Sequence, residues 1–248
     1  MKIYLDHRPK RVALVAMGPS IVGFLGDTLT QELTPDWVDE VWTINMASFA
    51  IRHDVVFWMD DLVSQRDFRP PLIDLLNKHG TPVITSKRHP QLVPNSWDYP
   101  IQEVSDISFD VFGRPYFNNG VAMAVAYALW KGVETLKVYG ADFTYPDRNY
   151  AETGRGCIEG WLVYCMTKGM TVEVTPGTSL FDMRGSCGVY GYAEQPEIAA
   201  PDGSRVRCVA APEGWMGLGY AAADSSGRIL SDGETRLRPA GYGEQVRA

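Results

Sequence analysis

The chain has 248 residues, of which 45% are hydrophobic and 11% aromatic, and this composition fits a globular protein of one or two domains. Its 23 Lys and Arg against 30 Asp and Glu give a formal charge of −7, which excludes a general attraction to nucleic acid or anionic lipid. The four cysteines form no CxxC pair, the first residues do not resemble a secretory signal, and the longest apolar run is too short to span a bilayer. We therefore expect a cytoplasmic protein.

The first half of the chain alternates between strand-like and helix-like segments. An apolar run, RVALVAM, stops at Gly18-Pro19-Ser20, and apolar residues then recur at helical spacing at Val22, Leu25, Leu29 and Leu33. A short helix is expected at 70–80, between a proline at its start and a glycine at its end. About 30 residues with several Pro and Asp, before residue 120, are interpreted as a loop. The strands expected in this half are 11–17, 40–46, 54–60 and 81–86.

The alternation continues to about residue 175. A nearly all-apolar helix is expected at 120–131, and apolar residues at helical spacing predict another around 158–166, which Gly169 is expected to cap. Strands are expected at 135–140 and 170–175. Strands that alternate with helices indicate an α/β, Rossmann-like fold with a mainly parallel sheet and helices on both faces. We expect this domain to span 1–184, and a small β-rich extension rich in Gly, Pro and Ser to span 185–248, with short strands at 205–211, 217–223 and 227–233.

Polar residues follow the ends of the expected strands. In a parallel sheet these ends meet at one edge, where ligands bind and helices begin. Asn118, Asn119 and Gly120 stand at the start of an apolar helix, where unpaired N–H groups and the helix dipole favour an anion such as a phosphate. The other polar residues at strand ends are Gly18, Pro19, Ser20, Asn45, Asp60, Asp61, Ser86, Lys87, Arg88, Gly140 and Asp142.

Each of these groups also has a purely structural interpretation. Gly18-Pro19-Ser20 can be a turn with a serine cap, and it lacks both the GxGxxG spacing and a Walker lysine. Asn118-Asn119-Gly120 can be a helix cap alone. Asp60-Asp61 can be a solvated strand end or can hold a divalent metal, Mg²⁺ or Mn²⁺. The four histidines show no zinc-ligand spacing.

The order of these signals resembles that of a known group of enzymes. VALVAMGPSI, VWTINM and YFNNGVAMAVAYALWKGVETLKVYGADF follow one another as in the sialyltransferase-like superfamily. That group includes bacterial sialyltransferases of glycosyltransferase family 42, flagellin-glycosylation accessory proteins and 6-hydroxymethylpterin pyrophosphokinase-like proteins. The resemblance covers about residues 11–180 and implies a Rossmann-like domain that binds a nucleotide, commonly a cytidine nucleotide sugar.

The resemblance also implies roles for individual residues. Gly18, Pro19 and Ser20 would meet the phosphates or ribose and Asn45 the nucleotide. The base or a phosphate would lie at Asn118, Asn119 and Gly120. Asp142 and Tyr145 would line the same pocket, with Tyr150 as a phosphate partner.

Two positions depart from the pattern of the sialyltransferases. Met17 stands where they have an asparagine, and the stretch after Tyr150, AETGRGCIEG, lacks the histidine that acts there as general base. The carboxylates available for catalysis are then Glu152 and Glu159, together with Asp142.

We therefore expect a glycosyltransferase-like enzyme that transfers a sugar from a nucleotide sugar to a glycan, a small molecule or a modified nucleic-acid base. The alternatives are a metal-dependent phosphotransferase of the pyrophosphokinase type, which would use Asp60, Asp61 and Asp142, and a catalytically silent nucleotide-binding or assembly protein. A homo-oligomer is compatible with each. The sequence also predicts that Asn119→Ala weakens nucleotide binding and leaves the fold intact.

Overall fold

The computed structural model describes residues 7–30, 37–175 and 177–181, together with strands at 198–199, 205–210 and 220–224. Contacts divide the chain into two compact units, Met1–Leu180 and Phe181–Ala248. The boundary expected after residue 184 falls among residues outside this description. No helix in the described ranges has the length and hydropathy to cross a membrane.

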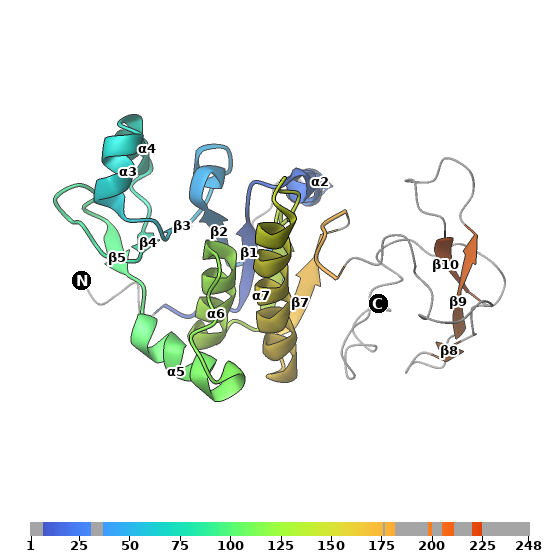
Figure 1. Ribbon diagram of the computed structural model, residues 1–248. Helices are drawn as coiled ribbons and strands as arrows, with labels where there is room; N and C mark the ends of the chain where they lie inside the picture. Colours follow the sequence, from blue (N-terminus) through green and yellow to red (C-terminus); the bar gives the residue numbers. More distant parts are fainter. Residues whose placement is uncertain are drawn as a thin grey trace. The chain divides into compact units, whose positions relative to one another are not determined.

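A parallel seven-stranded sheet forms the centre of the first unit (Figure 1), in the order β5-β4-β3-β2-β1-β6-β7. Every neighbouring pair is parallel, which confirms the expected α/β, Rossmann-like class. The strands are β1 Arg11–Val15, β2 Glu40–Ile44, β3 Val55–Trp58, β4 Val83–Thr85, β5 Ser96–Asp98, β6 Thr135–Tyr139 and β7 Thr171–Val174.

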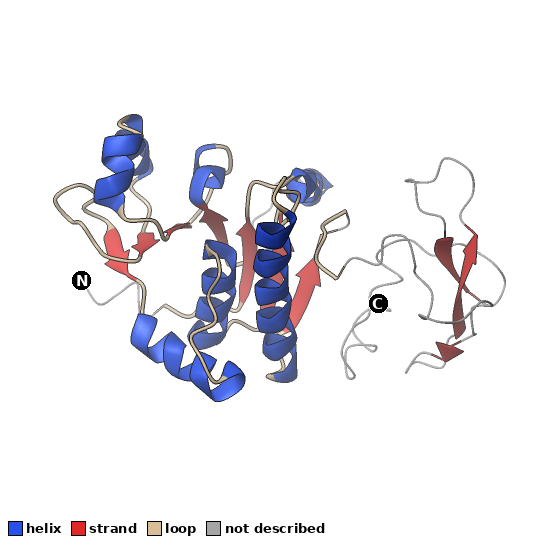
Figure 2. Cartoon of the chain, in the orientation of Figure 1, coloured by secondary structure: helices blue, strands red, loops and turns tan. Residues whose placement is uncertain are grey.

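Helices cover both faces of this sheet, and Figure 2 shows α6 and α7 in front of the strands. Side chains alternate along β1, so that Val12 and Leu14 pack in the cluster with α6 and α7, while Ala13 and Val15 pack with Phe24 of α2. The α-helices are α2 Val22–Thr30, α3 Leu62–Phe68, α4 Pro71–His79, α5 Ile101–Phe112, α6 Gly120–Lys131 and α7 Arg148–Thr167. Two 3₁₀ helices, η1 Pro19–Ile21 and η3 Asn45–Phe49, follow β1 and β2.

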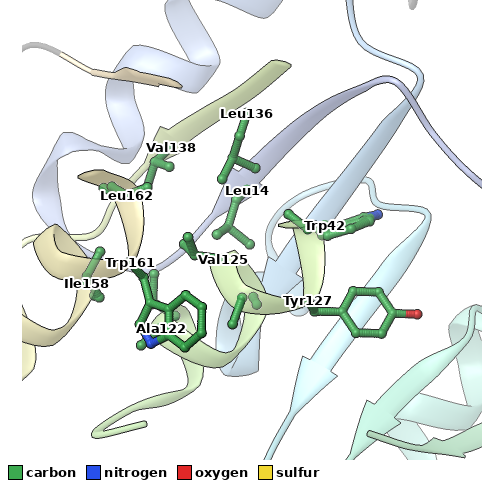
Figure 3. Close-up of a cluster of buried hydrophobic side chains, with 14 of the residues drawn as sticks. Leu14, Trp42, Ala122, Val125, Tyr127, Leu136, Val138, Ile158, Trp161 and Leu162 are labelled. Carbon is green, nitrogen blue, oxygen red and sulfur yellow. The ribbon is translucent and has the colours of Figure 1, made fainter. Parts of the chain in front are cut away.

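The larger core lies between the sheet and the pair α6 and α7 (Figure 3). Ala122 and Val125 of α6 are fully buried, as are Ile158 and Trp161 of α7. The indole Nε1 of Trp161 donates to the carbonyl of Tyr116, 2.7 Å away, so the one polar atom of this side chain is satisfied. Burial of each large side chain contributes about 1.5–3 kcal/mol, and this packing fixes the start of both helices relative to the strands.

The predicted loop before residue 120 is wrong, because it contains β5 and α5. Strand β5 has only three residues, Ser-Trp-Asp, at the edge of the sheet, which leaves no alternation to detect. Helix α5 is bounded by Pro100 and by Gly113, which adopts φ +66°. Its buried residues are Val104 and Ser108. Because Ser108 is polar, it interrupts the apolar residues at helical spacing along the buried face.

The apolar residues whose spacing predicts helix α2 face solvent in the structure. Val22, Leu25 and Leu29 are all exposed, whereas Phe24 is the buried residue of the helix. Leu33 lies outside the described residues.

The second unit contains an antiparallel sheet in the order β10-β9-β8, with β8 Ile198–Ala199, β9 Arg205–Ala210 and β10 Tyr220–Asp224. Two of the strands expected there correspond to β9 and β10, and the third, at 227–233, lies outside the described residues.

Candidate functional site

The direction in which successive strands are added to the sheet reverses between β1 and β6. From β1 the sheet grows through β2 to β5 on one side, and β6 and β7 are added on the other. The loops after β1 and β6 therefore leave toward opposite faces, and in open α/β sheets ligands bind outside the carboxyl ends of the strands at such a point. The loops after β1 and β2 lie at the top of Figure 1.

Ser20 and Asp142 join the two loops at this point. The backbone N–H of Ser20 donates to Asp142 Oδ2 at 2.5 Å, and its hydroxyl donates to Asp142 Oδ1 at 2.8 Å. The same hydroxyl accepts from the N–H of Gly140 at 3.1 Å. Both carboxylate oxygens of Asp142 are thus engaged by Ser20, which is only 5% exposed. The pair holds the two turns together.

Gly18 is required by the closeness of these turns. Its N–H donates to the carbonyl of Gly140 at 2.7 Å. A Cβ at Gly18 would stand 2.6 Å from that carbonyl oxygen and 2.6 Å from Asp142 Oδ2, closer than side chains tolerate. Gly140 itself adopts φ +66°, a conformation that glycine reaches without strain. Met17 and Pro19, on either side of Gly18, are exposed.

Asn45 begins the short helix η3 directly after β2. Its backbone has φ +48°, in the left-handed region that Asn tolerates better than most residues. Its carbonyl accepts from the hydroxyl of Ser48 at 2.8 Å. Its side-chain amide is partly buried and makes no hydrogen bond within the described ranges. This amide is therefore available to a ligand.

Asn119 caps α6 and also ties it to α7. Its Oδ1 accepts from the N–H of Ala122 at 2.8 Å, and its Nδ2 donates to the carbonyl of Gly154 at 3.1 Å. A Cβ at Gly154 would meet the ring of Phe143 at 2.6 Å, so this glycine allows the close packing. The amide of the exposed Asn118 makes a longer bond to the carbonyl of Thr153, 3.4 Å.

The start of α6 lies over the ends of β2 and β3. A Cβ at Gly120 would stand 3.7 Å from Ile44 Cγ2, immediately before Asn45, and 3.8 Å from Met59 Cγ, immediately before Asp60. The first N–H groups of α6, which have no acceptor within the helix, therefore face the same edge as the turns after β1 and β6.

Aromatic side chains line the approach to α7. Phe143, Tyr145 and Tyr150 form a run of edge-to-face contacts with ring centroids 6.1 and 5.1 Å apart. Tyr145 and Tyr150 are both more than half exposed. Partial burial raises the pKa of Tyr145, and the nearby Tyr150 raises it further by a smaller amount. The hydroxyl of Tyr145 therefore stays protonated and can donate a hydrogen bond.

The two glutamates expected to be catalytic lie at different depths on α7. Glu152 is exposed in the second turn, with its carboxylate 4.0 Å from the guanidinium of Arg148. Glu159 lies about 16 Å along the axis from the start of the helix, so the structure does not bring it to the carboxyl edge. Asp147 caps the helix by accepting from the N–H of Tyr150.

The acidic pair after β3 forms no metal cluster with other side chains that the structure describes. Asp61 caps α3, and its Oδ1 accepts from the N–H and hydroxyl of Ser64 at 2.8 and 3.0 Å. These bonds hold the pKa of Asp61 below its ordinary value. Asp60 is exposed. Among the described residues, no group of three or more His, Cys, Asp or Glu has the arrangement to hold a metal. Metal binding by this pair stays a prediction.

Four of the sequence-predicted residues lie in two contact groups at this edge, whereas Glu159 lies away from it. Gly18, Ser20 and Asp142 form one, and Asn119 forms the other with Gly154 and Phe143, next to Asp142 in the chain. Sequence reasoning missed Gly154, because a glycine inside a helix signals close packing only when its partner is known. A separate cavity of about 380 Å³ lies between residues 48–53 and the end of α4, and it includes His53.

Comparison with known proteins finds similarity to a solved structure. No protein-family profile and no curated protein matches the sequence. Among solved structures, the chain is similar to the sialyltransferase CstII from Campylobacter jejuni, determined in complex with a substrate analogue, cytidine-5'-monophosphate. The identity is 13% and the TM-score 0.44, over 78% of this chain and 96% of that chain. The fold assignment rests on the strand order and register of the chain itself.

Proposed function

We propose that this protein is a nucleotide-sugar-dependent glycosyltransferase whose donor binds across the carboxyl ends of β1, β2 and β6. The observation that carries this proposal is the closely packed switch point between β1 and β6, fixed by Ser20 and Asp142. The order of the sequence motifs along the chain supports a nucleotide sugar as the ligand at that place.

We assign the roles of the residues from the polar groups that each can still offer to a ligand. Gly18 and Pro19 would offer the backbone of the turn after β1, which the contacts of Gly18 with Asp142 and the Gly140 carbonyl hold in place. The amide of Asn45 would donate to or accept from the base or ribose. The first N–H groups of α6 would face a phosphate, with Asn118 beside them. Tyr145 and Tyr150 would contact a phosphate from the side of β6. Ser20 and Asp142 would hold the turns that carry these groups.

Ligand-induced stabilisation tests this proposal. The melting temperature is measured with cytidine, uridine, guanosine and adenosine nucleotides and their sugar conjugates, each with and without Mg²⁺ or Mn²⁺. At 100 times its Kd a ligand adds about 2.7 kcal/mol, which raises the melting temperature of a unit of this size by roughly 5–10 °C. Stabilisation by a nucleotide or nucleotide sugar supports the proposal. Metal-dependent stabilisation by a triphosphate alone favours a pyrophosphokinase, and no response to any favours a protein without nucleotide function.

Asn45→Gly is the sharpest single substitution for this site. Glycine keeps the positive φ without strain and removes only the amide, so we expect a stability change under about 1 kcal/mol. If the amide binds the nucleotide, affinity falls by about one to two decades, equivalent to roughly 1–3 kcal/mol. Asn45→Ala is the matched control, since it removes the same amide and also costs about 1–2 kcal/mol of backbone strain. Unchanged affinity in both variants would remove Asn45 from the site.

A further inference from the structure

A histidine and a carboxylate meet at the carboxyl ends of β3 and β4. His89 lies in the loop after β4, and its Nε2 is 3.2 Å from Asp61 Oδ2. The other oxygen of Asp61 is occupied by the N–H and hydroxyl of Ser64. The side chain of His89 is 16% exposed and that of Asp61 43%. The pair is therefore accessible from solvent and yet largely packed.

The backbone around His89 fixes the position of the ring. Its N–H donates to the hydroxyl of the buried Ser96 at 3.0 Å, and its carbonyl accepts from the N–H groups of Leu92 and Val93. Since a carboxylate only accepts, the neutral ring carries its proton on Nε2, and Nδ1 then has a lone pair. Nδ1 makes no hydrogen bond to any residue that the structure describes.

Two further polar atoms, at the ends of β3 and β4, have no hydrogen-bond partner among the described residues. Trp58 and Thr85 are paired in register at the last positions of β3 and β4, so they lie on the same face of the sheet. The indole Nε1 of Trp58 and the hydroxyl of Thr85 are buried without a hydrogen bond in the described part of the chain. Buried polar groups of this kind are uncommon and require an explanation.

We propose that His89 is the general base of the transfer reaction, with Asp61 as the positioning residue that orients its ring. This inference rests on the proposed function. Nδ1 takes the proton of the acceptor hydroxyl as its oxygen bonds to the anomeric carbon of the donor sugar. The bond from that carbon to the phosphate oxygen breaks, and its electron pair leaves with the nucleotide. The imidazolium then gives its proton to solvent.

The geometry of the sheet is compatible with this assignment. Adjacent strands lie about 4.8 Å apart, which places the ends of β3 and β4 roughly 10 and 14 Å from β1. The start of α6 bridges part of this interval, because Gly120 lies against Ile44 and Met59. A nucleotide held between β1, β2 and β6 would direct its sugar over β3.

The test measures release of free nucleotide from CMP-N-acetylneuraminic acid, UDP-N-acetylglucosamine and GDP-mannose, with water as acceptor. We expect His89→Ala and His89→Gln to lower kcat by about 10²-fold or more, with little change in KM. Added imidazole should restore turnover in the alanine variant. Asp61→Asn keeps a good helix cap and should lower kcat by roughly tenfold or more through loss of ring orientation. His79→Ala, at the exposed end of α4, is the matched control and should leave kcat unchanged.

The outcomes separate this inference from the function on which it rests. If the wild-type protein releases no nucleotide from any donor, the proposed function fails and the inference with it. If the wild type is active and His89→Ala retains its kcat, or imidazole restores nothing, the inference alone is overturned. A lowered melting temperature with unchanged kcat would show that the pair only anchors the loop after β4, and this too would overturn it.

Discussion

Asn119 makes two separable contributions to stability, and three variants can measure them. Its Oδ1 caps α6 through the N–H of Ala122, and its Nδ2 links α6 to α7 through the carbonyl of Gly154. A cap of this type contributes about 1 kcal/mol, and the second hydrogen bond a net 0.5–1.5 kcal/mol, or about 1 kcal/mol. Asn119→Ala removes both and should cost about 2 kcal/mol. Asn119→Ser retains a cap and should cost about 1 kcal/mol.

Chemical denaturation followed by circular dichroism measures these differences, and thermal melting should show losses of roughly 4–8 °C for alanine and 2–4 °C for serine. Asn118→Ala is the control, because its exposed amide makes only a 3.4 Å bond to Thr153 and its loss should cost under about 0.5 kcal/mol. Equal losses in the alanine and serine variants would show that the cap contributes nothing. Nucleotide affinity measured on the same proteins then tests whether the second N–H of this amide also binds ligand.

Three other substitutions probe the switch point and the buried histidine. Gly18→Ala should destabilise the protein by roughly 1–3 kcal/mol, since its Cβ would stand 2.6 Å from the Gly140 carbonyl, and a wild-type denaturation midpoint would contradict that packing. Ser20→Ala leaves the buried N–H of Gly140 without an acceptor and frees one oxygen of Asp142, so unfolding should become easier by about 2–4 kcal/mol; a change below 1 kcal/mol would show that the link is dispensable. Burial lowers the pKa of His53 below its ordinary 6.5, so its contribution to stability is present above pH 6.5 and is lost as pH falls below it. Stability measured from pH 7.5 to 5 should decline less in His53→Gln, and parallel curves would refute this linkage.

The sequence predicts the elements of the first unit well where their chemistry is local. The helix at 120–131 has bounds confirmed as Gly120–Lys131, because Asn119 caps one end and Gly132 the other. Helix α7 begins ten residues before the apolar period that predicts it, since its first turns contain Thr153 and Gly154, which are poor helix formers. The cap of Asp147 and the packing of Gly154 against Phe143 stabilise these turns. Both contacts depend on tertiary structure, which local propensity does not register.

The candidate site, too, is predictable from the sequence only in part. Strand ends identify the edge of the sheet at which Gly18, Ser20 and Asp142 meet, because the position of such residues follows from the parallel fold alone. The partners of each side chain do not follow from it. That Ser20 bonds to Asp142, or that His89 meets Asp61, depends on loops whose course is set by packing elsewhere. The metal expected at Asp60 and Asp61, and the catalytic roles of Glu152 and Glu159, stay predictions.

The strand order has a consequence for how the chain folds. Strands β1 to β4 each pair with the next strand along the chain, whereas β6 must return to pair with β1. The hydrogen bonds of Ser20 to Asp142 close a separation of 122 residues. Because closing a long loop costs more entropy than closing a short one, we expect β1 to β5 to associate first and β6 to join afterwards. During synthesis the switch point can form only after residue 142 has left the ribosome, so a ligand that binds there would recognise only chains in which both halves of the sheet have come together.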